Sequence, residues 1–404
     1  MSASGLPAAE LPACEGGSPV REAFLPFFRP SLGPEEEAAV LEVLRSGWLT
    51  TGPRTEAFEA EFAAFTGARH ALAVSSCTAG LDLLLRGLGI GPGDEVIVPA
   101  VTFPSTANVV LQAGARPVFA DVHPERLSLD PDSVRRVLGS ATRALIAVHL
   151  FGWPCEMDPL QALCAEHGLA LLEDAAHGIG ARYGGRSVGT FGDGASFSFY
   201  ATKNMTTGEG GMLTTERDEL AARLRRVRLH GIDVDATGRD GKAYRHWEAV
   251  SLGWKCNLTD LQAALGRVQL GRLPGFLAER RRLDARYRAI LDRIDAFQTV
   301  GGPDGAENAA HLFPILIRPG ALRIDRDRLL QALLAENVGV GVHFRALPLH
   351  RHFREAVGTP PEAVPVASES SARLLSLPLY PGLSDADLDD VGEALARLAR
   401  YYRA

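Results

Sequence analysis

The chain has 404 residues, of which 46% are hydrophobic and 23% charged, and this composition excludes a disordered or fibrous protein. Its formal net charge is −7 and it lacks a long block of Lys and Arg, so we do not expect a nucleic-acid partner. The five cysteines are scattered without C-x-x-C spacing, which implies neither disulfides nor a bound metal.

The N-terminal stretch does not have the pattern of a targeting signal. Residues 1–20 contain Glu10 and Glu15, without a basic start and an apolar run. No window of the chain approaches the roughly 20 apolar residues of a membrane-spanning helix, so we expect a cytoplasmic protein with no membrane partner. Residues 1–25 are rich in Ala, Gly, Pro and Ser, and this predicts a loose N-terminal arm outside the core.

Two amphipathic helices and a strand are predicted next. Pro34 and an acidic first turn begin a helix that ends at Gly47, and a second helix ends at Gly67. A strand over 71–74 then runs into 75–80, S-S-C-T-A-G, where hydroxyls and backbone N–H groups gather at a helix start. Such a junction can bind a phosphate, and it can equally be only a helix cap.

The following segments alternate between strands and helices. Apolar strands over 96–99, 117–121, 144–149 and 169–173 predict a parallel sheet with helices on both faces. Ligands of such sheets bind beyond the carboxyl ends of the strands. The polar residues that fall at these ends are Asp121, His149, Asp174 and His177.

A further strand is predicted over 195–200, where small or hydroxyl residues alternate with aromatic ones. Lys203 follows it, before a glycine-rich stretch. An amine walled by aromatic rings can lose hydration, and its pKa then falls, as a Schiff-base lysine requires. Taken singly, Lys203 is also compatible with a solvated loop lysine, and Asp174 with an ion-pair or capping role.

The C-terminal half is predicted to contain helices over 216–228, 258–269 and 277–294, with a polar loop over 230–248. Strands over 312–317 and 338–344 and helices over 325–336 and 385–402 then predict a smaller α+β unit. We therefore predict three parts: an N-terminal arm over 1–25, a large domain over 26–275 and a small C-terminal domain over 276–404.

Several ordered motifs resemble those of one enzyme family. They are G-W-L-T-T-G-P at 47–53, S-S-C-T-A-G-L at 75–81, G-D-E-V-I-V-P-A-V-T-F at 93–103, E-D-A-A-H at 173–177, S-F-S-F-Y-A-T-K-N at 196–204 and G-W-K-C-N-L-T-D at 253–260. Over roughly residues 25–400 the chain resembles the fold type I pyridoxal-phosphate (PLP) enzymes, and among them the DegT/DnrJ/EryC1/StrS nucleotide-sugar aminotransferases. The implied fold is α/β, with a mostly parallel seven-stranded sheet, helices on both faces and a smaller C-terminal α+β domain.

The resemblance implies a role for each candidate residue. Lys203 would form the Schiff base with PLP, Asp174 would contact the ring nitrogen, Phe103 would stack on the ring and His177 would lie near the ring hydroxyl. The phosphate would be held by Cys77, Thr78, Ala79 and Ser198. The substrate would face His230, His343 and His350.

The resemblance also implies a homodimer with shared active sites. The loop over 230–257 would reach into the neighbouring subunit, where Lys255 or Asn257 would complete the phosphate site. Many family members read G-Y-N-Y-R where this chain has Trp254, Lys255, Cys256 and Asn257, so which side chain contacts the phosphate is left open.

The implied reaction moves an amino group from L-glutamate to a keto group of a nucleotide-activated keto-deoxy sugar by a ping-pong mechanism. R-L-H-G-I-D-V-D-A at 228–236 resembles the branch that aminates C4, which includes the 4-amino-arabinose enzymes. Three alternatives stay open: a keto-cyclitol acceptor, a PLP- or PMP-dependent sugar dehydrase, and a non-catalytic PLP-binding regulator. The dehydrases carry histidine where Lys203 stands.

Overall fold

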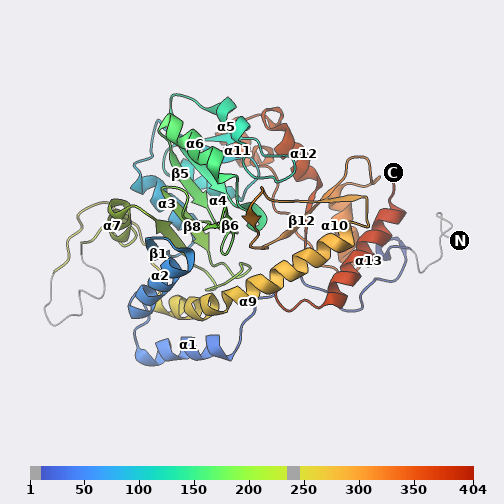
Figure 1. Ribbon diagram of the computed structural model, residues 1–404, viewed down its shortest axis with the longest axis horizontal. Coiled ribbons are helices and arrows are strands. Elements are labelled where there is room, and N and C mark those ends of the chain that lie inside the picture. The colour runs from blue at the N-terminus through green and yellow to red at the C-terminus, as the bar shows by residue number, and fades with distance from the viewer. Residues whose placement is uncertain (1–10, 234–245) are drawn as a thin grey trace.

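The computed structural model describes residues 11–233 and 246–404 (Figure 1). Its centre is a seven-stranded sheet with the order β1-β9-β8-β5-β4-β2-β3. All neighbouring strands are parallel except in the two pairs that β9 forms, so the predicted mostly parallel sheet is confirmed. The strands are β1 (His70–Val74), β2 (Glu95–Pro99), β3 (Arg116–Ala120), β4 (Thr142–Val148), β5 (Ala170–Asp174), β8 (Gly194–Ser198) and β9 (Gly211–Thr215).

The two faces of this sheet pack against different helices, because successive side chains of a strand point to opposite sides. In β1, Leu72 and Val74 pack with α3, α4 and α7, whereas Ala71 and Ala73 pack with α2. Helices α5 and α6 pack against Leu145 of β4 and the buried side chains around it. These helices are α2 (Pro53–Thr66), α3 (Cys77–Gly87), α4 (Pro104–Gln112), α5 (Pro131–Val137), α6 (Met157–His167) and α7 (Asp218–Val227).

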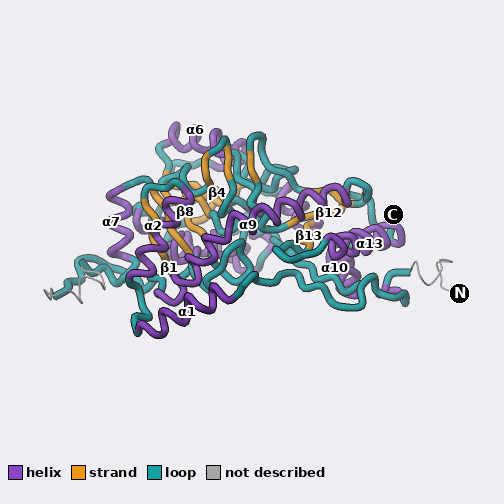
Figure 2. The backbone as a smooth tube through the Cα atoms, turned by 60° about the horizontal axis from the view of Figure 1, so that its bottom comes forward, coloured by secondary structure: helices purple, strands orange, loops and turns teal. Residues whose placement is uncertain are grey.

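One long helix, α9 (Asp260–Leu291), runs from beneath the large sheet to the C-terminal part of the molecule, as two views show (Figures 1 and 2). The prediction of two helices over 258–269 and 277–294 is therefore wrong. Pro274 interrupts the sequence pattern, but Leu273 and Phe276 are buried on either side of it. Burial of these two side chains keeps the helix continuous, although Pro274 cannot donate a backbone hydrogen bond. Helix α1 (Pro34–Ser46) lies against α9.

The C-terminal part contains an antiparallel sheet of β10 (Phe297–Thr299), β12 (Phe313–Ile317) and β13 (Leu374–Leu377). With α10 (Arg326–Ala335) and α13 (Asp385–Tyr401) it forms what we call the small unit. The remaining elements are α11 (Arg351–Ala356), α12 (Pro365–Arg373), the sheet of β11 (Ala306–Glu307), β6 (Arg182–Tyr183) and β7 (Arg186–Ser187), and single 3-10 turns at Ala13–Glu15, Leu150–Gly152, Leu347–Leu349 and Pro361–Ala363.

Two sequence predictions fail in this part. Residues 338–344 do not form a strand, because only two isolated bridges, Leu25↔Val338 and Gly341↔Ser376, join this stretch to its neighbours. Residues 11–25 are not a loose arm: Leu11 and Leu25 are buried, and this stretch is hydrogen-bonded to the small unit. The predicted boundary at 275/276 falls inside α9, and the division into three parts stays a prediction. Among the described helices, none is long and apolar enough to cross a membrane.

Candidate functional site

A cavity of about 440 Å³ lies where the carboxyl ends of β5 and β8 face the small unit. This is the place where open α/β sheets bind ligands. It brings together eight of the predicted site residues: Cys77, Thr78, Phe103, Asp174, His177, Ser198, Lys203 and His343. Seven of these side chains lie at the ends of β5 and β8 or in the loops and helix starts that follow β1, β2, β5 and β8, so the sheet sets their relative positions. His343 comes from the stretch that follows α10.

Lys203 lies in the loop that follows β8, where its backbone N–H donates to the Tyr200 carbonyl at 2.9 Å. Loss of hydration in this enclosed site lowers the pKa of Lys203 to about 8, while Cys77 and Asp174 nearby act in the opposite direction. Compared with a free lysine, a much larger share of the amine is neutral near pH 7. Such an amine can attack a carbonyl carbon and can exchange a proton.

Asp174 is the last residue of β5 and its side chain is buried. Its Oδ2 accepts a hydrogen bond from Thr106 Oγ1 at 2.8 Å, and Oδ1 accepts one from the Ala176 N–H at 3.2 Å. Thr106 in turn shares a hydrogen bond of 2.8 Å with Thr102. These contacts fix the carboxylate orientation. The sequence analysis missed Thr106, and no pattern in the chain distinguishes it from the other hydroxyl residues of its helix.

The helix α3 begins at the cavity wall. The Ser76 hydroxyl accepts a hydrogen bond from the Ala79 N–H at 3.0 Å, so this amide is already paired, and Ala79 does not line the cavity. Ser76, Cys77 and Thr78 line it, and so does Ser198. A helix start with hydroxyl groups around it is the environment that a phosphate group requires.

Glycines let the helix start come close to the sheet. A Cβ on Gly80 would lie 2.2 Å from Ser196 Oγ, and one on Gly211 would lie 2.6 Å from the Ser76 backbone carbon. Either clash would push α3 away from β8 and β9. The Cys77 thiol is buried there, and burial together with the Asp174 carboxylate raises the pKa of Cys77 well above its usual range, so the thiol keeps its proton.

Two neutral imidazoles form another wall. Burial, and then the charge of Lys203, hold the pKa of His177 well below its ordinary value, and His311 is shifted in the same direction. Their ring centroids lie 4.4 Å apart. His177 Nδ1 accepts from the Phe151 N–H at 3.2 Å, and His311 Nδ1 pairs with Asn204 Oδ1 at 3.1 Å. His311 is a lining residue that the sequence analysis missed, because its place in the chain is about 110 residues from Lys203.

Two predicted crevice residues do not reach the cavity. Asp121 accepts hydrogen bonds from the Val366 and Ala367 N–H groups at 3.0 and 2.8 Å and so caps α12. His149 is wholly buried and lies 3.0 Å from Glu173 Oε2. Burial alone would lower the pKa of His149, but hydrogen bonds with Cys155 and Glu173 raise it to about 10. Both residues are structural.

Four further candidates lie outside the cavity of their own chain: His230, Lys255, Asn257 and His350. Asn257 forms a bridge with Val74, at the end of β1, and its amide donates to Thr51 Oγ1 at 2.6 Å. Lys255 Nζ donates to Asn257 Oδ1, also at 2.6 Å. Residues 234–245 of the predicted subunit-crossing loop lie outside the described residues.

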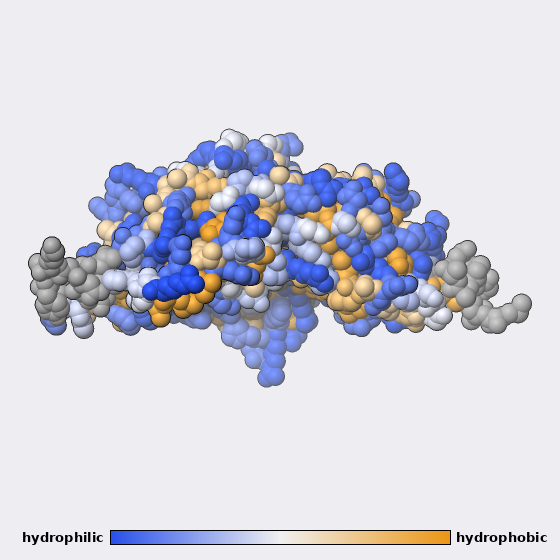
Figure 3. Space-filling model, turned by 90° about the horizontal axis from the view of Figure 1, so that it is seen from below, coloured by the Kyte–Doolittle hydropathy of each residue, from blue (hydrophilic) through white to orange (hydrophobic). Residues whose placement is uncertain are grey.

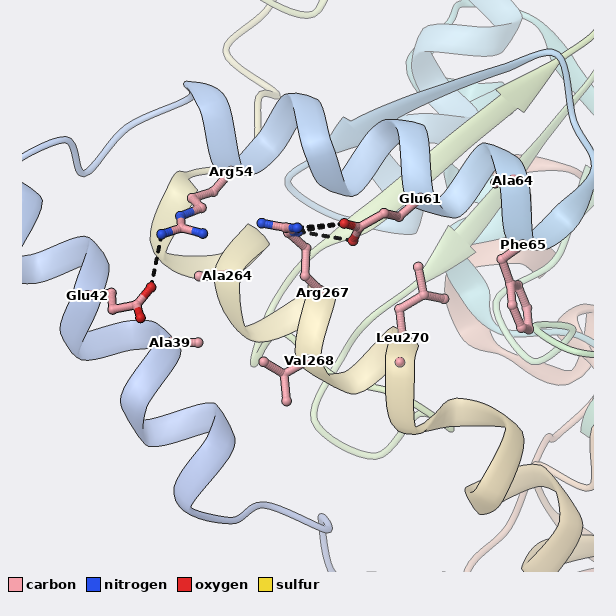
Figure 4. Close-up of a pocket in the computed structure, with 11 residues that line it drawn as sticks. Ala39, Glu42, Arg54, Glu61, Ala64, Phe65, Ala264, Arg267, Val268 and Leu270 are labelled. Carbon is pink, nitrogen blue, oxygen red and sulfur yellow. Dashed lines mark hydrogen bonds and ion pairs between the residues drawn. The ribbon is translucent and has the colours of Figure 1, made fainter.

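A second hollow of about 660 Å³ lies between α1, α2 and α9 and contains none of the candidate residues. Its charged side chains are already paired: Arg54 with Glu42 at 2.9 Å, and Arg267 with Glu61 at 2.6 Å (Figure 4). It therefore offers no free reactive group. Within residues 11–233 and 246–404, no group of three or more His, Cys, Asp or Glu side chains is placed to hold a metal ion.

Comparisons with known proteins agree on one family. The model of the DegT/DnrJ/EryC1/StrS aminotransferase family matches residues 30–396. The spore coat polysaccharide biosynthesis protein SpsC of Bacillus subtilis is 43% identical over 382 residues, which cover 94% of this chain and 98% of SpsC.

Solved structures are similar over nearly the whole chain. Spr1654 from Streptococcus pneumoniae in its PMP form gives a TM-score of 0.88 at 30% identity, over 93% of this chain and 99% of that one, and its PLP form gives 0.87. Helicobacter pylori PseC, an aminotransferase involved in the biosynthesis of pseudoaminic acid, gives 0.88 at 28% identity over 94% and 100%. The fold is thus that of the fold type I PLP-dependent aminotransferases, as predicted.

Proposed function

Because the chain belongs to the DegT/DnrJ/EryC1/StrS aminotransferase family, we propose that it transfers an amino group from L-glutamate to C4 of a nucleotide-activated keto-deoxy sugar, with Lys203 as its PLP-binding residue. The family and the relatives make the chain a PLP-dependent sugar aminotransferase. We propose in addition the amino donor, the class of acceptor, the carbon that is aminated and the roles of the site residues.

The cavity residues fit the cofactor. PLP supplies an electron sink that stabilises negative charge on the carbon next to the transferred nitrogen. Asp174, held by Thr106, offers the ring nitrogen a carboxylate. Thr78 and Ser198 surround the start of α3, where the phosphate would lie, and the half-exposed Phe103 ring faces the cavity. The single observation that carries the proposal is the amine of Lys203, of lowered pKa, in one cavity with these groups.

Lys203 is also the residue that moves protons. With a pKa of about 8, its amine can accept a proton from the substrate carbon and return it near neutral pH. His177 and His311 are held neutral, so they offer polar contacts without competing as acids. The same lysine therefore serves both halves of a ping-pong reaction, once with L-glutamate and once with the keto acceptor.

Two of the relatives support a sugar acceptor. One is a spore coat polysaccharide biosynthesis protein, and another takes part in pseudoaminic acid biosynthesis. The choice of C4 rests on the likeness of residues 228–236 and 253–260 to the 4-keto-sugar branch. A nucleoside diphosphate that competes with the acceptor would support a nucleotide-linked sugar, and failure to compete would favour a keto-cyclitol.

A second copy of the chain is part of this proposal. Leu41 and Leu44 of α1 are 45% and 51% exposed, and Val250 and Leu252 are 50% and 76% exposed. The face that carries α1 shows apolar patches among hydrophilic side chains (Figure 3). A homodimer would cover such residues, and Lys255 or Asn257 of each subunit would complete the phosphate site of the other.

Two measurements on the PLP-loaded protein test the function. L-Glutamate is expected to replace the absorption band of the lysine-bound cofactor with that of the pyridoxamine form. Borohydride reduction followed by peptide mapping is expected to mark Lys203 and neither of the other two lysines, Lys242 and Lys255. A mark on another lysine would refute the assignment, and an unchanged spectrum would refute L-glutamate as donor.

A further inference from the structure

We propose that Phe27 and Phe28 form an apolar wall of the acceptor site and select keto sugars with a deoxygenated carbon at that wall. The proposal rests on the proposed function. It gives residues 11–29, which we call the arm segment, a role in substrate choice. The arm segment lies before the stretch that the family model matches, which begins at residue 30.

The two rings belong to the same cavity as Lys203. The Phe27 ring stacks on His343, with centroids 5.3 Å apart and planes at 16°. The Phe28 ring meets the Tyr380 ring edge-on at 6.2 Å. Both side chains therefore lie on the side of the cavity that the small unit forms, opposite the sheet that carries Lys203.

A buried carboxylate fixes the arm segment. Glu336, directly after α10, is fully buried and accepts hydrogen bonds from the N–H groups of Ala13 and Val20 at 2.9 and 2.8 Å. Arg397 Nη1 lies 3.3 Å from the same carboxylate. Ordering a free segment costs about 1–2 kcal/mol per residue, and these contacts meet that cost during folding rather than during substrate binding.

The end of the arm segment is held by backbone pairing. The Leu25 N–H donates to the Asn337 carbonyl, and the Gly339 N–H donates to the Leu25 carbonyl, both at 2.8 Å. This parallel bridge ends two residues before Phe27. The bridge and the two ring contacts leave the phenylalanine rings little freedom, so they form a rigid surface before the acceptor arrives.

The two sides of the cavity differ in charge. The charged groups that line it within the described residues, Asp174, Lys203 and Glu209, all come from the sheet side. The facing side presents Phe344 and Leu379 beside Phe27 and Phe28, together with His343. Burial, and then Lys203, lower the pKa of His343 to about 4, so this side carries no charge near pH 7.

Such a wall suits carbon–hydrogen groups and not hydroxyls or carboxylates, since a polar group buried against it would lose its hydrogen bonds to water. L-Glutamate carries two carboxylates and gains little there. A keto sugar with a methyl group in place of a hydroxymethyl group gains apolar contact. The wall therefore acts in the acceptor half of the reaction.

The test separates the two half-reactions. Phe27→Ala and Phe28→Ala are compared with the wild type, using UDP- and dTDP-linked 4-keto-6-deoxyhexoses and the UDP-linked 4-ketopentose that lacks carbon 6. For the deoxyhexose, kcat/KM is expected to fall about tenfold or more, which is the usual effect of lost apolar contacts in a specificity pocket. The preference over the pentose is expected to shrink in parallel.

The rate at which L-glutamate converts the cofactor spectrum is expected to stay within about twofold of the wild type. The melting temperature, measured alongside, is expected to stay above the assay temperature. Phe24→Ala is the matched control, because Phe24 lies on the same segment, is 53% exposed and does not line the cavity. Unchanged deoxyhexose kinetics in both variants, or an equal loss in both half-reactions, would overturn the wall. If L-glutamate does not convert the wild-type cofactor spectrum, the proposed function is refuted. If L-glutamate converts it but the enzyme uses none of the keto sugars, the proposed acceptor is refuted and the role of the wall with it.

Discussion

Lys203 and its surroundings show how the chain makes a reactive amine from an ordinary residue. The fold places it beside two residues, Cys77 and Asp174, that come from two other stretches of the chain. Both neighbours favour the charged amine, but burial outweighs them and lowers the pKa of Lys203. The result is a lysine poised close to neutral pH.

The reactivity of Lys203 is expected to follow this shift. In the protein without cofactor, acetylation of Lys203, measured by mass spectrometry, is expected to reach half its maximal rate at about pH 8 rather than near the ordinary value of 10.5. Asp174→Asn removes the anion that favours the charged amine, so the midpoint is expected to move to lower pH. A midpoint near 10.5 in the wild type would show that the amine is solvated.

Thr106 is expected to act as a positioning residue for Asp174. Thr106→Val keeps the shape but removes the donor to Oδ2, and hydrogen bonds to charged groups contribute about 1.5–3 kcal/mol. We expect kcat to fall about tenfold to a hundredfold and the affinity for PLP to weaken, as measured by cofactor titration. Thr106→Ser keeps the hydroxyl and is the rescue control. Equal kinetics for the two variants would contradict this role.

Most of the candidate site residues could be predicted from the sequence, but the residues that hold them in position could not. Lys203, Asp174 and the start of α3 lie in ordered motifs directly after strands, where a pattern predicts both position and chemistry. His311 and Phe27 lie far from those motifs, and only tertiary packing brings them to the site. Thr106 lies three residues after the motif at 93–103, but nothing in the sequence shows that it contacts Asp174. Asp121 and His149 also follow strands, yet the backbone amides of α12 and the Glu173 carboxylate bind them instead.

Among the elements, β5 depends on a buried ion pair next to the site. Glu173 Oε1 accepts from the N–H groups of Phe191 and Gly192, and Oε2 accepts from Gly189 and pairs with His149. Burial disfavours the Glu173 carboxylate, but these partners lower its pKa overall. The loop before β8 is thereby tied to β5.

Breaking this pair is expected to be costly. Glu173→Gln leaves His149 without its anion, and loss of one partner of a buried pair costs about 3–5 kcal/mol in the free energy of unfolding. The folded-state pKa of His149 is raised to about 10 from 6.5, so its contribution is fully present below pH 6.5 and is lost as pH rises through 10. Urea unfolding at pH 6 and pH 10 measures both effects. A wild type and a variant with the same pH dependence would contradict the assignment.

The arm segment is expected to come loose when its anchor is removed. Glu336→Ala removes the acceptor of the Ala13 and Val20 N–H groups, and trypsin is then expected to cleave after Arg21, whose side chain is otherwise paired with Asp387 and Asp390. Limited proteolysis with mass spectrometry measures the rate. Glu22→Ala, on the exposed part of the same segment, is the control. Equal cleavage rates would show that Glu336 does not hold the segment.

The element predictions failed where local pattern and tertiary packing disagree. Pro274 with Gly271 and Gly275 reads as a helix break, but buried residues on both sides keep α9 continuous. Residues 338–344 read as a strand because they are apolar, yet their backbone is shared between the arm segment and β13. Six of the seven strands of the large sheet were predicted, because their apolar runs are buried on both faces. The strand β9 was missed, although it is buried as well.

At the scale of the whole molecule, the exposed apolar residues offer a test of the proposed homodimer. Leu252→Asp places a charge on a side chain that is 76% exposed in one chain, so it leaves the fold of the single chain intact. If a second copy covers Leu252, sedimentation analysis is expected to show dissociation, and PLP affinity is expected to fall with it. Phe24→Asp is the control, because Phe24 is another exposed apolar side chain, at 53%, and contacts the small unit. If the variant forms a dimer of unchanged stability, Leu252 does not lie in the interface.

The anchoring of the arm segment also affects the order in which parts of the protein fold during synthesis. Residues 13–21 leave the ribosome long before their partners Glu336, Asp387, Asp390 and Arg397. The first described residues and the C-terminus lie at the same end of the molecule (Figure 1). Contacts between such distant residues form slowly, because a very long loop must close first. The nascent chain can therefore complete the large sheet and its lysine early, while the wall opposite that lysine forms only after the small unit has been synthesised.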